Sequence, residues 1–142
     1  MRILFLCTSN SARSQIAEGI LRHVGGDEVE VLSAGTLPMG VHSAAVRVMA
    51  ELGIDISAQQ SKSIDQFLDQ PFDYVITLCD EADEICPVFP GGRQRLHWSI
   101  ADPVVVKEKE DERLNAFRKV RDEVFARVCS FLALNISDRD SA

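Results

Sequence analysis

Eight residues near the start of the chain combine a nucleophile with an anion-binding side chain. Five small or polar residues separate Cys7 from Arg13, and Ser14 follows directly. A cysteine at the start of a helix favours its nucleophilic thiolate form, because the helix N-terminus carries partial positive charge. The planar guanidinium of Arg13 can bind two oxygens of one tetrahedral anion. We interpret residues 7–14 as an oxyanion loop in which Cys7 is the nucleophile.

The other members of the oxyanion loop are suited to hold an anion through their backbone. Small polar residues allow a tight path in which N–H groups converge on one point. Asn10 suits a left-handed backbone position, and Ser14 can donate a hydrogen bond to the sulfur of Cys7. The alternative is a buried structural Cys7 beside a surface Arg13. The residues expected to contact the oxyanion are Thr8, Ser9, Asn10, Ser11, Ala12, Arg13 and Ser14.

Chemistry on a tetrahedral oxyanion also needs a proton for the departing oxygen. Asp102 and Pro103 follow an apolar segment, in a loop that can return the carboxylate to the oxyanion loop. A partly desolvated Asp102 would act as a general acid, and Pro103 restricts the backbone that holds it. An Asp-Pro pair by itself is more often a simple turn. The catalytic role therefore depends on the oxyanion loop being present.

Two further cysteines, Cys79 and Cys86, flank an acidic segment of helical character that Pro87 ends. Seven helical residues span about 10.5 Å, whereas a disulfide needs Cα atoms about 4.4–6.8 Å apart, so pairing would unwind the helix. Three interpretations stay open. The two thiols form a redox pair, or they are unrelated buried thiols, or they bind zinc together with His97 or His42, at a spacing that matches no common site.

Composition excludes several classes of protein. The chain of 142 residues has 22 acidic and 15 basic side chains, and its net charge of -7 argues against nucleic-acid binding. Its four cysteines are too few for a disulfide scaffold, and we expect Cys129 to pack in the core. No apolar run approaches the roughly 18 residues of a membrane span, and the first one is too short for a signal peptide. We expect a monomer in the cytoplasm that binds no membrane.

Apolar segments alternate with helical patterns along the chain. Expected strands cover residues 3–6, 29–32, 74–78 and 96–98, and expected helices cover residues 14–24, 43–52 and 110–134. This alternation predicts an α/β fold with a four-stranded parallel sheet covered on both faces. One three-layer domain should occupy residues 1–134, and a polar tail should occupy residues 135–142. Ligands of such sheets bind beyond the carboxyl ends of the strands, where Cys7 and Cys79 are expected.

Taken together, these residues resemble a known family. The Cys-x5-Arg-Ser motif with a late Asp-Pro is similar to the low-molecular-weight protein tyrosine phosphatase fold, and within it to arsenate reductases of the thioredoxin-coupled type. The likeness covers residues 10–19, 33–35, 53–57, 75–79, 86–87, 97–98 and 102–103. Its most discriminating element is the pair Cys79 and Cys86, which phosphatases of this fold do not need. The resemblance implies the flavodoxin-like strand order.

The resemblance also implies a mechanism. Cys7 attacks arsenate, held by Arg13 and the loop amides, while Asp102 protonates the departing hydroxyl. Cys79 then attacks Cys7 and releases arsenite, Cys86 attacks Cys79, and thioredoxin reduces the resulting disulfide. Phosphate and sulfate are the expected analogues of arsenate. Ala12 stands where these enzymes often carry a second cysteine, so this chain lacks a thiol that could trap Cys7 unproductively.

One departure from the family concerns a cation site behind the oxyanion loop. Asn10, Glu18 and Ser33 match the residues that support the loop in relatives with a potassium site, but Lys62 stands where those relatives have an acidic ligand. We infer that the ammonium of Lys62 replaces potassium and bonds to Glu18 or Asn10. We expect no tightly bound cofactor and no metal site.

Two other functions use the same residues. A protein tyrosine phosphatase would need Cys7, Arg13 and Asp102 together with aromatic walls, but Tyr74, the single tyrosine, lies inside an expected strand. Weak phosphatase activity is still expected, because phosphate and arsenate share shape and charge. The second alternative is a non-catalytic redox sensor or anion-binding module.

Overall fold

The computed structural model describes residues 1–80, 89–105 and 109–140. In these residues four parallel strands form one sheet in the order β2-β1-β3-β4. The strands are β1 (Arg2–Cys7), β2 (Glu30–Gly35), β3 (Tyr74–Thr77) and β4 (Gln94–His97). The predicted α/β fold with flavodoxin-like order is confirmed, and β1, which leads into the oxyanion loop, lies inside the sheet.

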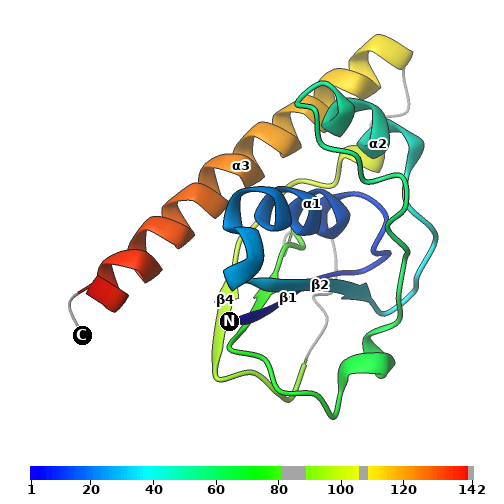
Figure 1. Cartoon of the computed structure of the whole chain (residues 1–142). Helices are drawn as coiled ribbons and strands as arrows, with labels where there is room; N and C mark the ends of the chain where they lie inside the picture. The colour runs from blue at the N-terminus through cyan, green and yellow to red at the C-terminus, as the bar shows by residue number, and fades with distance from the viewer. Residues whose placement is uncertain (81–88, 106–108, 141–142) are drawn as a thin grey trace.

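Three α-helices connect or follow the strands and gather on one side of the sheet (Figure 1). They are α1 (Arg13–Gly25), α2 (Ser43–Ala50) and α3 (Glu110–Asp140). Three short 3-10 helices complete the described elements: η1 (Gly26–Glu28), η2 (Ile64–Phe67) and η3 (Pro103–Val105). Each strand and helix predicted within the described residues is present, with shifts at its ends, and the acidic segment between Cys79 and Cys86 lies outside them.

Alternate side chains of β1 point to opposite faces of the sheet, as the two-residue period of a strand requires. Ile3 and Phe5 belong to the main hydrophobic core under the α-helices, whereas Leu4 and Leu6 belong to a second cluster on the other face. All four side chains are fully buried. Both faces of the sheet are therefore covered, as predicted.

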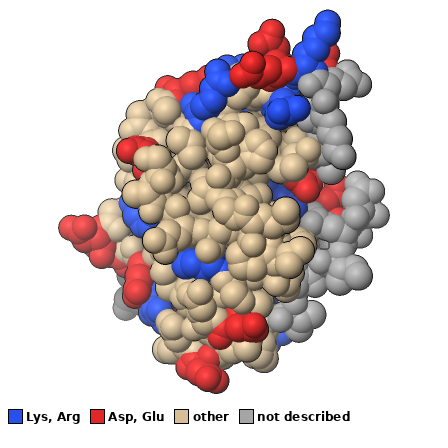
Figure 2. All heavy atoms as spheres, turned by 90° about the vertical axis from the view of Figure 1, so that its right-hand side faces the viewer, with Lys and Arg blue, Asp and Glu red and all other residues tan. Residues whose placement is uncertain are grey.

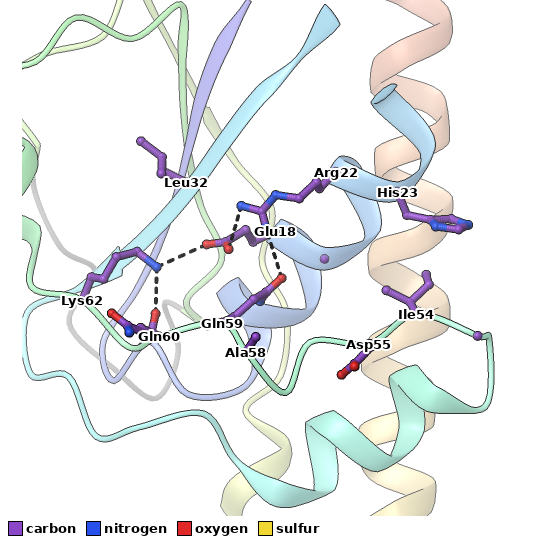
Figure 3. A pocket seen from close by; sticks show the side chains of 12 residues that line it. Glu18, Arg22, His23, Leu32, Ile54, Asp55, Ala58, Gln59, Gln60 and Lys62 are labelled. Carbon is purple, nitrogen blue, oxygen red and sulfur yellow. Dashed lines mark hydrogen bonds and ion pairs between the residues drawn. The ribbon is translucent and has the colours of Figure 1, made fainter. Parts of the chain in front are cut away.

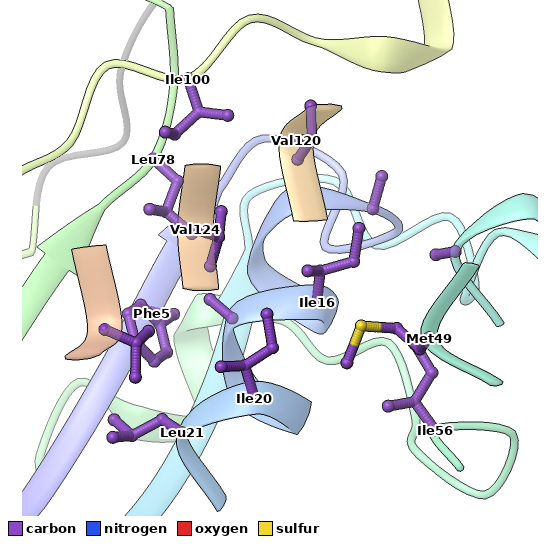
Figure 4. Close-up of a cluster of buried hydrophobic side chains, with 14 of the residues drawn as sticks. Phe5, Ile16, Ile20, Leu21, Met49, Ile56, Leu78, Ile100, Val120 and Val124 are labelled. Carbon is purple, nitrogen blue, oxygen red and sulfur yellow. The ribbon is translucent and has the colours of Figure 1, made fainter. Parts of the chain in front are cut away.

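The main core fixes α1 against the sheet and against α3 (Figure 4). Ile16 and Ile20 lie one turn apart on α1, and Val120 and Val124 lie one turn apart on α3. These four residues are nearly or fully buried in the same cluster. Because α1 begins at Arg13, the packing that holds α1 also fixes the end of the oxyanion loop.

The second face is covered differently. In the described part of the chain, η2 and a group of aromatic rings take the place of α-helices there. Phe72 packs edge-on against Phe67 and Phe89, with ring centroids 6.1 and 5.9 Å apart. The three layers thus consist of α-helices, the sheet, and an aromatic layer with a 3-10 helix.

The C-terminal helix differs from its prediction. α3 continues to Asp140, so the expected end of this helix at residue 134 is wrong and residues 135–140 of the predicted polar tail are helical. Asn135 accounts for part of this continuation, because its side chain accepts a hydrogen bond from the hydroxyl of Tyr74 at 2.9 Å and donates one to the carbonyl of Phe131 at 2.8 Å. Within the ranges the structure describes, no helix is both long and apolar enough to pass through a bilayer.

Cys129 also differs from its prediction. Its thiol is free and its side chain is exposed, so the expectation of a core residue is wrong. The buried stripe of α3 includes Val124, Val128 and Phe131. Cys129 comes one residue after Val128 and is therefore rotated by about 100° from that stripe.

Candidate functional site

The carboxyl ends of the strands bring the predicted site residues to one edge of the sheet, on the right in Figure 1. Cys7 is the last residue of β1, Cys79 comes two residues after β3, and Asp102 directly precedes η3. Leu6 pairs with Thr77 in the sheet, so the two cysteines follow neighbouring strands. Both cysteines are buried.

The oxyanion loop has the backbone that its sequence predicts. Asn10 has a φ of 48°, which confirms the left-handed position. Ala12 occupies the N-cap position of α1, and it has no side-chain oxygen that could bond to the first N–H groups of the helix. These donors and the positive end of the helix dipole are available to an anion.

A hydrogen-bonded pair activates the nucleophile. The sulfur of Cys7 lies 2.8 Å from the hydroxyl oxygen of Ser14. This oxygen also accepts a hydrogen bond from Nδ2 of Asn10 at 2.8 Å, and its own proton can be donated to the sulfur when Cys7 is a thiolate. A hydroxyl that donates to the sulfur stabilises the thiolate, the attacking form.

Arg13 is held in place by the loops that carry the other two functional residues. Its side chain is only 2% exposed, and Nη1 donates to the carbonyls of Leu78 at 3.3 Å and Ile100 at 3.0 Å. Nη2 lies 3.8 Å from Oδ2 of Asp102. These contacts confirm that the loop after β4 returns Asp102 to the oxyanion loop.

One oxygen of the Asp102 carboxylate is held by a hydrogen bond, and the side chain is partly exposed to solvent. Oδ1 accepts a hydrogen bond from the backbone N–H of Val104 at 3.0 Å, and the side chain is 35% exposed. Pro103 begins η3 directly after it. This position beside Arg13 lets Asp102 exchange a proton with a group bound in the oxyanion loop.

The buried carboxylate of Glu18 supports the loop from behind. Oε1 of Glu18 accepts a hydrogen bond from the hydroxyl of Ser33 at 2.6 Å, and Ser33 accepts one from Nδ2 of Asn10 at 2.9 Å. Asn10 in turn donates to Ser14, so hydrogen bonds connect Glu18 with the sulfur of Cys7. The predicted supporting residues Asn10, Glu18 and Ser33 are thus in contact.

Lys62 lies at the end of the same network. Its Nζ is 3.5 Å from Oε1 of Glu18 and donates to the carbonyl of Gln60 at 2.7 Å (Figure 3). Its backbone N–H donates to Oδ1 of Asn10 at 2.8 Å. Arg22 pairs with the other oxygen of Glu18 at 2.9 Å, so one buried carboxylate faces two cations.

A second segment, residues 36–42, holds the outer side of the oxyanion loop, and we call it the strap. The N–H groups of Leu37, Met39 and His42 donate to the carbonyls of the loop residues Thr8, Ser9 and Ser11 at 2.9, 3.0 and 2.9 Å. These bonds turn loop carbonyls outward toward the strap. The sequence interpretation missed the strap, because backbone hydrogen bonds leave no signal in residue types.

Gly35 permits the close approach of the strap to the loop. A Cβ atom at Gly35 would lie 2.5 Å from the carbonyl oxygen of Thr8 and 2.8 Å from that of Cys7. Real Cβ atoms do not approach backbone atoms so closely, so any larger residue would displace the loop. Its place at the end of β2, next to Cys7 in the register, was a signal that the sequence interpretation did not use.

Two polar residues near the loop were also missed. The buried amide Nε2 of Gln15 lies 3.1 and 3.0 Å from the carbonyl and Oδ1 of Asn10. The hydroxyl of Ser61 donates to the carbonyl of Asn10 at 2.9 Å. Both fix the strained left-handed residue of the loop. The helical pattern gave no signal for Gln15, because this residue lies opposite the apolar stripe that contains Ile16 and Ile20.

The cysteines are in different redox states. Cys79 is disulfide-bonded, whereas Cys7 and Cys129 carry free thiols. Cys86, which was predicted to pair with Cys79, lies outside the described residues. An oxidised Cys79 is no thiolate ligand, which counts against the zinc interpretation. Among the described residues, no group of three or more His, Cys, Asp or Glu side chains is arranged to hold a metal ion.

The surface around the site carries little charge. Figure 2 faces the edge of the sheet where the strands end, and its centre is mostly uncharged, although the chain has a net charge of -7. The acidic surplus therefore does not crowd the described part of this face. An anion approaching it meets less repulsion than the net charge suggests.

Comparisons with known proteins agree with this geometry. Residues 2–140 match the family described as low molecular weight phosphotyrosine protein phosphatase. An arsenate reductase of Halalkalibacterium halodurans is 47% identical over 129 residues, which cover 91% of this chain and 93% of that protein.

Solved structures extend the comparison to the fold. A structure described as an arsenate reductase in the phosphate binding state has a TM-score of 0.79 and 35% identity, and the match covers 93% of this chain and 96% of that one. A thioredoxin-dependent arsenate reductase from Corynebacterium glutamicum has a TM-score of 0.72 and 30% identity, with coverage of 96% and 62%.

Proposed function

The chain belongs to the arsenate reductases of the low molecular weight phosphotyrosine protein phosphatase family, and we therefore propose that it reduces arsenate to arsenite with electrons from thioredoxin. The most similar proteins named above are arsenate reductases, one of them thioredoxin-dependent. Phosphate and sulfate would bind as analogues, because they share the tetrahedral shape and negative charge of arsenate.

The first half of the proposed reaction uses the oxyanion loop. The thiolate of Cys7 attacks arsenic and forms a sulfur–arsenic bond, while one oxygen leaves as water with a proton from Asp102. Arg13 and the loop amides hold the remaining oxygens and stabilise the charge of the transition state. The hydrogen bond from Ser14 to Cys7 and the position of Asp102 beside Arg13 support these roles.

The second half is a thiol relay. The thiolate of Cys79 attacks the sulfur of Cys7, and the electron pair of the sulfur–arsenic bond passes to arsenic, which leaves as arsenite. The thiolate of Cys86 then attacks Cys79 and frees Cys7. Thioredoxin supplies two electrons and two protons to the resulting disulfide. The relay needs a compartment that keeps thiols reduced, which supports a cytoplasmic location.

One observation separates this proposal from simple phosphatase chemistry. Cys79, two residues after the strand that neighbours β1, is disulfide-bonded while the thiol of Cys7 is free. This is the combination expected after Cys7 has been released and before thioredoxin acts. A phosphatase needs no oxidation at Cys79.

An assay of NADPH consumption with arsenate, thioredoxin and thioredoxin reductase tests the proposal. Wild type should turn over, whereas Cys79→Ser should release no arsenite and Cys86→Ser should stop after one. Cys129→Ser is the matched control, because Cys129 is an exposed free thiol on α3, and it should keep the wild-type rate. Turnover that survives both relay substitutions would refute the mechanism.

A phosphatase side activity is a second candidate function, and the family match favours it. Aryl phosphate hydrolysis would use Cys7, Arg13 and Asp102 but no second thiol. Cys79→Ser should therefore keep this activity while it loses arsenate turnover. Fast aryl phosphate hydrolysis by a wild type that gives no arsenate turnover would make the phosphatase the better assignment.

We also propose that Lys62 takes the place of a potassium ion behind the loop. Its ammonium already lies between Glu18 and the carbonyl of Gln60, so the site does not suit a second cation. Exchanging sodium for potassium should leave the melting temperature of wild type unchanged. Lys62→Asp, which supplies an acidic ligand, should gain a potassium-specific increase. A clear potassium effect in wild type would contradict this proposal.

We further propose that the enzyme is a monomer. Each proposed step uses residues of one chain, and the site described above needs no contribution from a second copy. Sedimentation equilibrium at assay concentration should give the mass of one chain, and a dimer mass would contradict the proposal.

A further inference from the structure

His42 joins the oxyanion loop to two helices. Its backbone N–H donates to the carbonyl of Ser11 at 2.9 Å and forms the last bond of the strap. Its ring nitrogen Nδ1 accepts a hydrogen bond from the N–H of Ala44 at 3.0 Å and caps α2. The ring packs on Phe117 of α3, with centroids 4.8 Å apart.

We propose that His42 is a positioning residue for the oxyanion loop and that only its neutral imidazole fills this role. This inference rests on the proposed function, because it concerns the loop that would bind arsenate. His42 contacts the loop through its backbone, and its side chain determines where that backbone lies. A ring that caps α2 and packs on α3 fixes the strap, and the strap in turn fixes the carbonyls of the loop.

The requirement for a neutral ring follows from the cap. Nδ1 can accept the hydrogen bond from Ala44 only with its lone pair, and an imidazolium carries a proton on both ring nitrogens. Protonation therefore breaks the cap and leaves an N–H of α2 facing an N–H of the ring. The end of the strap is then no longer held at the start of α2.

Charged groups from the neighbouring elements act on the ring. Burial lowers the pKa of His42 below its ordinary value of 6.5, Arg113 on α3 lowers it further, and Asp102 in the loop after β4 raises it. Arg47 of α2 and Glu110 of α3 pair with each other at 2.6 Å. The net effect keeps the ring neutral at physiological pH.

The sign of the pH dependence follows from this direction. Because the folded protein holds the proton of His42 less tightly than the unfolded chain, the cap contributes stability above pH 6.5 and loses it as the pH falls through the lowered pKa. The strap should therefore loosen in mild acid, before the carboxylates of the protein titrate.

Two measurements test the proposal without arsenate reduction, so they remain informative if the proposed function fails. The first is sulfate affinity at about pH 8, which lies above the lowered pKa of His42. His42→Asn keeps a good cap and should bind sulfate within about twofold of wild type, whereas His42→Ala should bind about fivefold more weakly. His23→Asn, at an exposed histidine of α1, is the control and should match wild type.

The second measurement is amide hydrogen exchange of Leu37, Met39 and His42 by NMR, corrected for the intrinsic effect of pH. Wild type and His23→Asn should lose protection at these amides as the pH falls below about 6.5, and His42→Asn should not. The proposal is overturned if His42→Asn shows the wild-type pH dependence. It is also overturned if a folded His42→Ala binds sulfate as tightly as wild type. If His42→Ala does not fold, the exchange of His42→Asn decides.

Discussion

Two clusters in this protein have the same ionic composition and different surroundings. In one, Glu18 pairs with Arg22 at 2.9 Å and lies 3.5 Å from Lys62. In the other, Glu51 pairs with Arg118 and with Arg121, each at 2.7 Å. Each cluster thus has one carboxylate between two cations.

The clusters differ in burial and in what they contact. The side chain of Glu18 is 4% exposed, and its Oε1 accepts the hydrogen bond of Ser33 that leads to the oxyanion loop. The side chain of Glu51 is 39% exposed, and its partners lie on α3, so it joins two helices at the surface. The carboxylate with the shorter ion-pair distances is therefore the more exposed of the two.

This difference shows that the surroundings of an ion pair determine its role. At the surface, solvent screens the charges and a pair contributes little stability. In the interior, the loss of one partner leaves an uncompensated charge, and hydrogen bonds transmit the disturbance to their neighbours. We therefore expect the Glu18 cluster to control activity and the Glu51 cluster to affect only stability.

The largest effect is expected from Glu18→Gln. The variant leaves the partly buried ammonium of Lys62 without a counter-charge, whereas the side chain of Arg22 is 48% exposed and its guanidinium stays solvated, so the free energy of unfolding should fall by about 2 kcal/mol. Because Asn10 and Ser14 lose their support, kcat/KM for arsenate should fall by about tenfold or more. Urea unfolding and the coupled assay measure both. If Glu18→Gln kept the stability and the activity of wild type, the Glu18 cluster would not differ in role from the Glu51 cluster.

Ser14→Ala should separate activity from stability within the Glu18 network. The variant removes the hydroxyl that donates to the sulfur of Cys7, and a hydrogen bond to a charged group contributes about 1.5 kcal/mol, or about tenfold in kcat/KM. At a fixed pH, the rate of Cys7 alkylation by iodoacetamide should fall. An unchanged alkylation rate would mean that Ser14 does not stabilise the thiolate.

Glu51→Gln should change the pH dependence of stability and leave activity within about twofold of wild type. Hydrogen bonds from Arg118 and Arg121 lower the pKa of Glu51 to about 2. Its contribution to stability is therefore fully present above the ordinary value of 4.5 and is lost as the pH falls to about 2. Melting temperatures of wild type and variant should converge over this range. A difference in melting temperature that persists near pH 2 would contradict the proposed contribution of ionised Glu51 to stability.

Arg118→Lys should give the smallest effect. Nε and Nη2 of Arg118 bind the two oxygens of Glu51 as a fork, which a lysine cannot reproduce. Because the pair is exposed, the melting temperature should fall by about 2 °C or less, with wild-type kcat/KM. Differential scanning calorimetry measures the shift. A large fall would show that the Glu51 cluster holds α2 and α3 more strongly than its exposure implies.

The strand and helix order was predictable because periodic apolar residues marked each element. Ile3 to Leu6 and Tyr74 to Leu78 predicted the central strands, and the stripe of α3 predicted its buried face. The prediction failed at two kinds of position. At one, neighbouring residues of a helix point in different directions, and at the other, a contact with a residue distant in sequence stabilises the end of a helix. Cys129 is adjacent to Val128 but faces solvent, and Asn135 extends α3 through a bond to Tyr74.

The site was predictable where chemistry depends on residue type. A thiol, a guanidinium and a carboxylate indicated Cys7, Arg13 and Asp102, and the structure brings them to one edge of the sheet. The strap and Gly35 were not predictable in the same way, because their roles depend on backbone hydrogen bonds and on space. Such features become visible only when segments distant in sequence meet.

The contacts of Arg13 also constrain how the protein matures during synthesis. Its guanidinium bonds to the carbonyls of Leu78 and Ile100, and β1 pairs with β3 as well as β2. When only the segment up to the end of α2 has left the ribosome, the nascent chain already contains Cys7. It still lacks Leu78 and Ile100, whose carbonyls orient the guanidinium of Arg13. The reactive cysteine therefore emerges as an ordinary thiol, and its oxyanion chemistry begins only after most of the chain has been translated and folded.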